Sequence, residues 1–217
     1  MSCDIKIMAT RARAENVMNL CYDLGLNIKE DVFFDDRSEP KGAMYTARKT
    51  WNLPIKEGIT HRCVLQDDVA VCGDFYEAIQ KLTRLYPDVI YSLYCSRRAL
   101  QYYNWPTMLD VKGCGVYGQA IIVPVKYIKS IFEWVDSINP NYPHDDTAIG
   151  EYAKYHGIKV YTPVPNLVQH LCPNDSILGY NNKNKISKCY HGGNVLRFDW
   201  DVAPLESITI NNSVPVK

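Results

Sequence analysis

The stretch Cys63-Val-Leu-Gln-Asp-Asp-Val69 guides the interpretation of the whole chain. Its first three residues are apolar and predict a short buried strand, and Asp67 and Asp68 follow after one residue. A helix is expected from Asp74, because Asp74 is a favourable N-cap and Glu77 stands three residues later, as in a capping box. A strand that ends in acids and leads into a capped helix is typical of an α/β sheet, in which ligands bind beyond the carboxyl ends of the strands.

The same alternation of strands and helices extends outward from this stretch in both directions. Val17, Leu20, Cys21 and Leu24 recur with the spacing of one helix face, and Gly157 is a suitable stop for a later helix. Strands are predicted near residues 5–8, 32–34, 63–65, 89–95, 119–123 and 158–161, and helices near residues 17–24, 42–51, 74–86, 127–138 and 145–156. We therefore predict one α/β, Rossmann-like domain over residues 1–200, with a mixed central sheet and helices on both faces. Residues 201–217 are expected to form a weakly ordered tail.

Composition and charge exclude several classes of protein. The chain has 217 residues, and its 24 Lys and Arg balance 24 Asp and Glu, so no strong overall field draws it to nucleic acid or a membrane. No apolar run approaches the roughly 20 residues of a membrane span, and no secretory signal is evident at the N-terminus. The eight cysteines show no C-x-x-C spacing and are expected to be reduced and mostly buried. These features predict a cytoplasmic globular protein.

The two acids after the strand predict a cation site. At the carboxyl end of a strand, a carboxylate such as Asp68 is able to point into a cleft. Hard oxygen ligands there suit Mg²⁺ or Mn²⁺, which bridge phosphate oxygens. A pair of acids in a solvated turn is an equally good interpretation of the spacing alone.

The triplet Gln66-Asp67-Asp68 resembles the acidic motif, Asp-x-Asp or Glu-Asp-Asp, of nucleotide-sugar-dependent glycosyltransferases of the GT-A fold. With Asp74-Phe75 shortly after, it is similar to N-acetylglucosaminyltransferase-like members, and the resemblance covers roughly residues 1–180. It implies a GT-A domain in which Asp68 binds the metal directly and Asp67 contacts the donor ribose or sugar. Gln66 stands where the family usually has an acid, and its amide is expected to bind a donor hydroxyl.

The resemblance extends to the donor pocket. Ala9-Thr-Arg11 lies where the family binds the nucleotide base, which implies donor-binding roles for Thr10, Arg11 and the nearby Arg13. A surface arginine at a helix start is the alternative. Further donor-pocket positions implied by the resemblance are Lys41, Arg48 and Gly115 of the glycine cluster at residues 113–118.

Two later segments complete the expected site. His144-Asp-Asp146 opens a predicted helix, and in similar enzymes an acid in this region takes the proton of the acceptor hydroxyl. Asp145 and Asp146 are both candidates for this base, and one of them is expected to cap the helix instead. Val168-Gln-His170 resembles the family's late Val-Gln-His element, which continues here as Asp175-Ser-Ile-Leu-Gly179. The resemblance implies that His170 completes the metal shell or contacts the diphosphate.

The expected activity is metal-dependent glycosyl transfer from a nucleoside diphosphate sugar, with a UDP-sugar favoured, to an acceptor hydroxyl with inversion. The acceptor is a glycan, a protein, or a hydroxymethylated DNA base as in small viral transferases of this fold, and no membrane is involved. Arg97, Arg98 and residues 183–188 are candidates for a local basic strip on such DNA. The alternatives are a nucleotidyltransferase of related fold and a non-catalytic module that binds nucleotide sugars.

Overall fold

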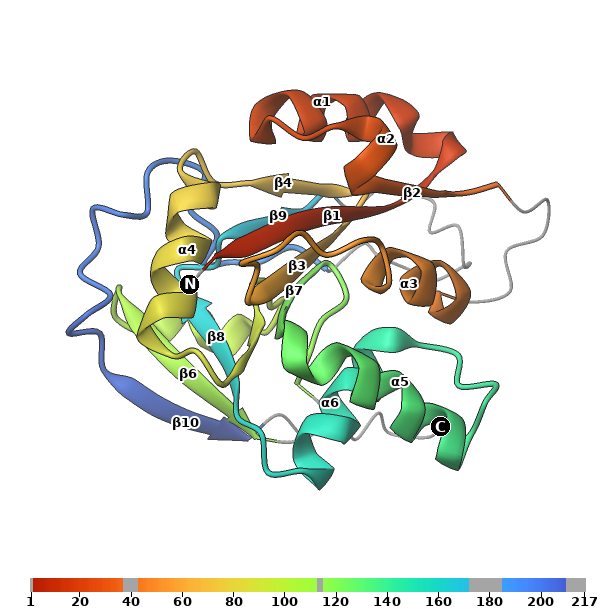
Figure 1. Cartoon of the computed structure of the whole chain (residues 1–217). Coiled ribbons are helices and arrows are strands. Elements are labelled where there is room, and N and C mark those ends of the chain that lie inside the picture. Colours follow the sequence, from red (N-terminus) through yellow and green to blue (C-terminus); the bar gives the residue numbers. More distant parts are fainter. Residues whose placement is uncertain (1, 37–42, 113–114, 172–184, 210–217) are drawn as a thin grey trace, which may run out of the picture.

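A single mixed sheet organises the chain. The computed structural model describes residues 2–36, 43–112, 115–171 and 185–209. Its main sheet has eight strands in the order β10-β6-β8-β5-β7-β3-β1-β2, and β4 pairs with β9 in a separate two-stranded sheet (Figure 1). The strands are β1 Cys3–Thr10, β2 Val32–Asp35, β3 His61–Gln66, β4 Val69–Val71, β5 Ile90–Ser92, β6 Thr107–Lys112, β7 Ala120–Pro124, β8 Val160–Val164, β9 Val168–His170 and β10 Leu205–Thr209.

Strand direction divides the main sheet into parallel and antiparallel pairs. Strand β1 runs parallel to β2 and β3, β5 runs parallel to β8, and β6 runs parallel to β10. Strand β7 runs antiparallel to both β3 and β5, and β6 runs antiparallel to β8. The carboxyl ends of β1, β3 and β5 and the beginning of β7 therefore lie at one edge of the sheet, and Thr10 and the Gln66-Asp67-Asp68 stretch lie at this edge.

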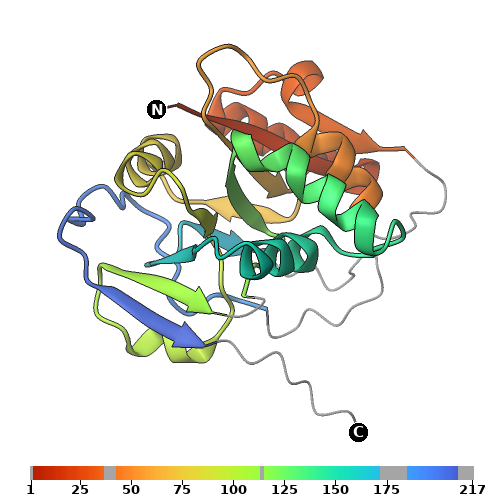
Figure 2. The same cartoon turned by 60° about the horizontal axis from the view of Figure 1, so that its bottom comes forward.

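Helices cover both faces of the sheet (Figure 2). The α-helices are α1 Ala14–Leu24, α2 Ile28–Asp31, α3 Met44–Trp51, α4 Phe75–Leu85, α5 Val125–Ile138 and α6 Asp145–Tyr155, and the 3-10 helices are η1 Arg11–Arg13 and η2 Arg98–Tyr102. Helices α1 and α4 pack on one face, and α3, α5 and α6 pack on the other. This arrangement confirms the predicted α/β class, with a mixed sheet between two helical layers.

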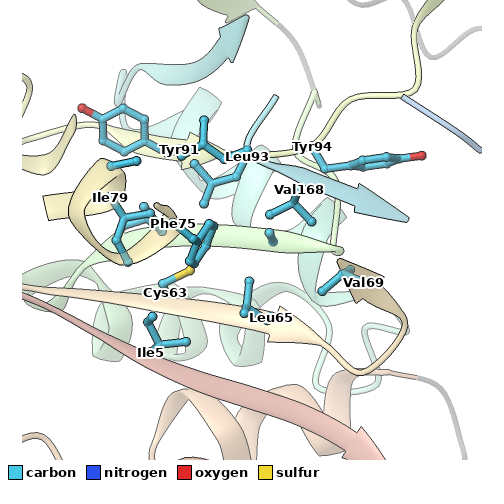
Figure 3. Close-up of a cluster of buried hydrophobic side chains, with 14 of the residues drawn as sticks. Ile5, Cys63, Leu65, Val69, Phe75, Ile79, Tyr91, Leu93, Tyr94 and Val168 are labelled. Atoms are coloured by element: carbon cyan, nitrogen blue, oxygen red, sulfur yellow. The ribbon is translucent and has the colours of Figure 1, made fainter. Parts of the chain in front are cut away.

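Alternation along the central strands produces two cores. Cys63 and Leu65 of β3 face the α1–α4 side, whereas Val64 between them faces the α3–α5–α6 side. Figure 3 shows the first core, in which Phe75 and Ile79 of α4 lie over β3. Both faces of β3 are thus apolar, as expected for a strand in the interior of a two-sided sheet.

The helix ends follow the predicted signals in part. Gly25 and Gly157 have φ values of 63° and 67°, which suit glycine after a helix end. Asp74 precedes α4, but its side chain makes no capping hydrogen bond. Its carboxylate instead accepts hydrogen bonds from the backbone N–H groups of Val195 and Leu196, at 2.8 and 2.6 Å. The predicted capping interaction is therefore wrong, because a partner distant in sequence takes the carboxylate.

The expected tail after residue 200 contains a strand. Leu205–Thr209 forms β10 and pairs with β6 at the edge of the main sheet. Most of its side chains are exposed, so backbone hydrogen bonds rather than a buried apolar face hold it. The prediction of a weakly ordered segment is wrong for these five residues, because an edge strand with exposed side chains lacks a hydrophobic pattern.

Candidate functional site

Hydrogen bonds join the carboxyl ends of β1 and β3. The two strands are parallel neighbours, and Met8 of β1 lies opposite Gln66, the last residue of β3. Two residues beyond Met8, Thr10 donates from its backbone N–H and its hydroxyl to Asp67 Oδ2, at 2.7 and 2.9 Å. Asn16 at the start of α1 donates to the Asp67 carbonyl. The acidic turn is thereby fixed against the beginning of the first helix.

Arg13 bridges the two predicted acids. Its Nη1 lies 2.7 Å from Asp67 Oδ1 and 2.8 Å from Asp68 Oδ2. The Asp67 and Asp68 side chains are 5% and 8% exposed, and that of Arg13 is 18% exposed, so little water screens these contacts. The cation therefore neutralises part of the negative charge that the two adjacent carboxylates bring to this edge.

The second sheet brings His170 to Asp68. Val69 of β4 lies opposite His170 of β9, and the Leu171 N–H donates to the Asp68 carbonyl at 2.9 Å. His170 Nε2 lies 3.2 Å from Asp68 Oδ2, and both side chains are buried. This pair joins two segments that are 102 residues apart in sequence. The structure thus brings together the two residues predicted as metal ligands.

The two acids have opposite pKa shifts. Burial raises the pKa of Asp67, although the contacts with Arg13 and Thr10 act to lower it. Burial also acts to raise the pKa of Asp68, but the hydrogen bond with His170 and the positive charge of Arg13 lower it below its ordinary value. Asp68 is therefore the acid held more firmly in its ionised form.

One oxygen of Asp68 fits a cation. Asp68 Oδ1 is buried and has no hydrogen-bond partner among the described residues, whereas Oδ2 contacts Arg13 and His170. A carboxylate oxygen and an imidazole nitrogen are ordinary ligands for divalent ions, and Mg²⁺ commonly takes its remaining ligands from water and substrate phosphates. Within the described residues, no three His, Cys, Asp or Glu side chains are grouped to hold a metal by themselves. The residues therefore fit a metal that is shared with a phosphorylated ligand.

The two acids at the start of α6 face different surroundings. Asp145 is only 3% exposed. Burial and the charge of Asp146 raise the pKa of Asp145 to about 7, against the opposing effect of the Trp51 side chain. Asp146 is half-buried, and its Oδ2 accepts a hydrogen bond from the Gly118 N–H at 3.2 Å. Asp146, not Asp145, therefore lies against the turn that leads into β7.

Gly118 joins Asp146 to the acidic motif. A Cβ atom on Gly118 would lie 2.8 Å from Gln66 Nε2 and 3.4 Å from Asp146 Oδ2. Gln66 is the last residue of β3, directly before Asp67, and Gln119 Nε2 lies 3.5 Å from Gln66 Oε1. The Gln66 amide thus lies between Asp146 and the motif, and only a glycine leaves this space open.

The other predicted donor residues lie at different places. Arg11 donates to the exposed Asp36 at 2.6 Å, and Arg48 of α3 pairs with Asp136 of α5 at 2.6 and 3.1 Å rather than with the acidic motif. Gly115 is buried in the segment before β7. Lys41 and residues 175–179 lie outside the described residues, as do residues 183 and 184 of the proposed basic strip.

Several site residues escaped sequence reasoning. Gly118 carried a signal only as one of several glycines before a strand, and Asn16 carried none. Arg97 was predicted only as part of a basic strip, and its Nε donates to the hydroxyl of Tyr117, the residue before Gly118, at 3.1 Å. The ring of Tyr94 packs edge-on against both Tyr117 and His170, with centroids 5.7 and 6.1 Å apart. Arg97, Tyr117 and Tyr94 are therefore connected in a chain of contacts that ends at His170.

The comparisons with known proteins give only distant structural likenesses. No protein-family model matches the chain, and no curated protein matches it in sequence. One similar solved structure is a glycosyltransferase involved in the glycosylation of the major capsid of PBCV-1, with 13% identity and a TM-score of 0.44 over 78% of this chain and 94% of that one. Another is the inositol-1-phosphate CTP transferase from T. maritima, with 9% identity and a TM-score of 0.37 over 84% and 74%. The case for a function therefore rests on the site itself.

No described helix has both the length and the apolar character needed to cross a membrane.

Proposed function

We propose that the chain is a glycosyltransferase that uses a nucleoside diphosphate sugar, with UDP-sugars as the first candidates. The observation that carries the proposal is the convergence of two chemically distinct groups at one sheet edge. Asp68, Arg13 and His170 form a charged group suited to a diphosphate and a divalent ion. Asp146 lies on the other side of Gln66 and Gly118, where it would take the proton of the acceptor hydroxyl.

The donor is held by the strand ends in this proposal. Thr10 and Arg11 lie at the end of β1, where the nucleotide enters, and Arg13 supplies positive charge next to the phosphates. Asp68 and His170 would hold Mg²⁺ or Mn²⁺, and the ion would neutralise charge on the leaving diphosphate. The Gln66 amide reaches a sugar hydroxyl, and Asp67 keeps Thr10 and Arg13 in position.

Asp146 acts as the base in this proposal. Its carboxylate takes the proton of the acceptor hydroxyl while that oxygen bonds to the anomeric carbon, and the bond from this carbon to the diphosphate oxygen breaks. The Gly118 and Thr147 N–H groups orient the carboxylate at 3.2 and 2.6 Å. A single displacement of this kind inverts the anomeric carbon. The acceptor is a glycan, a protein or a hydroxymethylated DNA base.

The test uses donor turnover and donor binding together. Each nucleotide sugar of a panel is incubated with the protein, with and without Mn²⁺, and free nucleotide diphosphate is measured; thermal shift reports binding. We expect Mn²⁺-dependent hydrolysis of one donor. Asp68→Asn should lose both Mn²⁺-dependent binding and turnover, whereas Asp146→Asn should keep binding and lose turnover.

The control variant is Asp88→Asn, because Asp88 lies near the start of β3 at the opposite end of the sheet. It should behave like the wild type. Full turnover by Asp146→Asn would contradict the assigned base, and the absence of binding by every nucleotide sugar would overturn the proposal. Release of pyrophosphate from a nucleoside triphosphate with a sugar phosphate would instead identify a nucleotidyltransferase.

A further inference from the structure

We infer that Arg13 competes with the divalent ion for Asp68. When the ion binds, the Arg13 guanidinium moves from Asp68 to the donor diphosphate. This inference rests on the proposed function, because it assigns Arg13 a role in how that same site takes up its ligands. It makes Arg13 the residue that couples the affinity for metal to the affinity for diphosphate.

The geometry of Asp68 carries the inference. The Arg13 Nη1 lies 2.8 Å from Asp68 Oδ2. The other oxygen of Asp68, Oδ1, is buried and has no hydrogen-bond partner among the described residues. A buried oxygen is not reached by an ion from solvent unless a neighbouring group moves. Arg13 has the more exposed of the two side chains, with 18% of its surface exposed against 8% for Asp68. Of Arg13 and His170, the two side chains on Asp68 Oδ2, Arg13 is the more exposed, with 18% against 1%, so in this proposal Arg13 is the group that moves.

The charges give the reason for the coupling. Asp67 and Asp68 together carry two negative charges, which Arg13 balances in part at 2.7 and 2.8 Å. A divalent ion next to Asp68 would lie close to the guanidinium, and two cations on one carboxylate repel each other strongly in a poorly screened site. A diphosphate relieves this repulsion, because guanidinium groups bind phosphate oxygens well. Metal and diphosphate are therefore expected to strengthen each other's binding.

Asp67 provides the anchor for this exchange. Its Oδ1 contacts Arg13, while its Oδ2 is held by two hydrogen bonds from Thr10. The same Arg13 Nη1 contacts both acids, so a small rotation of the guanidinium that keeps Nη1 on Asp67 Oδ1 would take it off Asp68 Oδ2. The guanidinium stays near the strand ends where the phosphates bind.

The experiment measures Mn²⁺ binding directly, without any sugar donor or turnover. Free Mn²⁺ is followed by electron paramagnetic resonance in titrations of the wild type and of Arg13→Gln, each with and without UDP as the diphosphate probe. Reciprocal coupling between sites commonly amounts to about 5–150-fold in affinity. We expect Arg13→Gln to bind Mn²⁺ at least about tenfold more tightly than the wild type without UDP. We also expect UDP to enhance Mn²⁺ binding by the wild type more than by the variant.

Three further variants make the outcome specific. Arg84→Gln removes an arginine from the exposed last turn of α4 and should leave Mn²⁺ affinity unchanged, which controls for net charge. Asp68→Asn in the Arg13→Gln background should abolish the gained affinity, which assigns the binding to this site. Arg13→Met is the substitute if circular dichroism shows that Arg13→Gln is not folded.

The inference is overturned if Arg13→Gln and Arg13→Met bind Mn²⁺ no more tightly than the wild type. It is also overturned if none of the proteins binds Mn²⁺. Failure here differs from failure of the proposed function. If the wild type hydrolyses a nucleotide sugar while the Arg13 variants gain no Mn²⁺ affinity, the transferase stands and the inference falls. If the variants gain affinity as expected but no donor is consumed, the inference stands and the transferase falls.

Discussion

Replacement of the buried Asp145 by asparagine should change how the stability of the protein depends on pH. Asp145 is 3% exposed, and burial together with the charge of Asp146 raises its pKa from 3.8 to about 7. Asparagine has nearly the same shape and does not titrate in this range. The comparison of wild type with Asp145→Asn therefore isolates the cost of ionising this one carboxyl group.

The sign of the effect follows from proton binding. Between its unfolded and folded pKa values, the group binds a proton in the folded state and has lost it in the unfolded state, so the free energy of unfolding falls as pH rises. Each pH unit in this window costs about 1.4 kcal/mol. From pH 5 to pH 8, ionisation of Asp145 should lower the free energy of unfolding by about 2.5 kcal/mol, and the loss is complete above the folded pKa.

The assay is urea unfolding at pH 5 and pH 8, followed by the fluorescence of the four tryptophans. The free energy of Asp145→Asn minus that of the wild type should increase by about 2.5 kcal/mol from pH 5 to pH 8. Other titrating groups, among them His61, are present in both proteins and cancel from this difference. In an Asp146→Asn background the change should be smaller, because one cause of the raised pKa is removed.

A difference in stability that stays constant between the two pH values would refute this reasoning. It would mean that Asp145 is ionised in the folded protein already at pH 5, and that its surroundings stabilise the charge. The exposed Asp23→Asn variant serves as the matched control, and its difference from the wild type should vary little over the same range.

Three further substitutions test other parts of the structure. Gly118→Ala should reduce donor turnover at least about tenfold and change stability little, because the added methyl displaces the flexible end of Gln66, 2.8 Å away; normal turnover would contradict this. Arg62→Leu should lower the free energy of unfolding, measured with urea, by about 3–5 kcal/mol. It leaves the Asp4 carboxylate and three backbone carbonyls without their buried partner. A loss below about 1 kcal/mol would contradict this reasoning. Asp74→Ala should lower the free energy of unfolding, measured by thermal unfolding, by about 1–3 kcal/mol, because it leaves the N–H groups of Val195 and Leu196 without their acceptor.

The central part of the fold follows directly from the sequence. Strand β3 and the strands around it are apolar on both faces, so their runs are recognisable without a partner. Strands β4, β6, β9 and β10 were not predicted. Strand β9 has three residues, and β10 is exposed, so neither shows a periodic pattern.

The site was predictable in its residue types but not in its contacts. Asp68 and His170 stand out as an acid and an imidazole near strand ends, and in the structure their side chains are in contact. The bridge from Arg13 to both acids depends on the direction that a long side chain takes at the end of η1, which no local pattern records. The choice between Asp145 and Asp146 depends on which of them α6 turns toward the core, and no local sequence pattern decides this.

The reversed direction of β7 has a consequence for how such a site diversifies. The chain leaves the site edge after β1 and β3, but it arrives at this edge before β7, so the arriving segment presents the Gly118 N–H to Asp146. Insertions or substitutions in the arriving segment would reshape the half of the proposed site that meets the acceptor. The hydrogen bond between Thr10 and Asp67 joins the ends of β1 and β3, so changes in the segment before β7 would leave it intact. If the proposed function holds, this topology would let acceptor choice diverge while recognition of the nucleotide is retained.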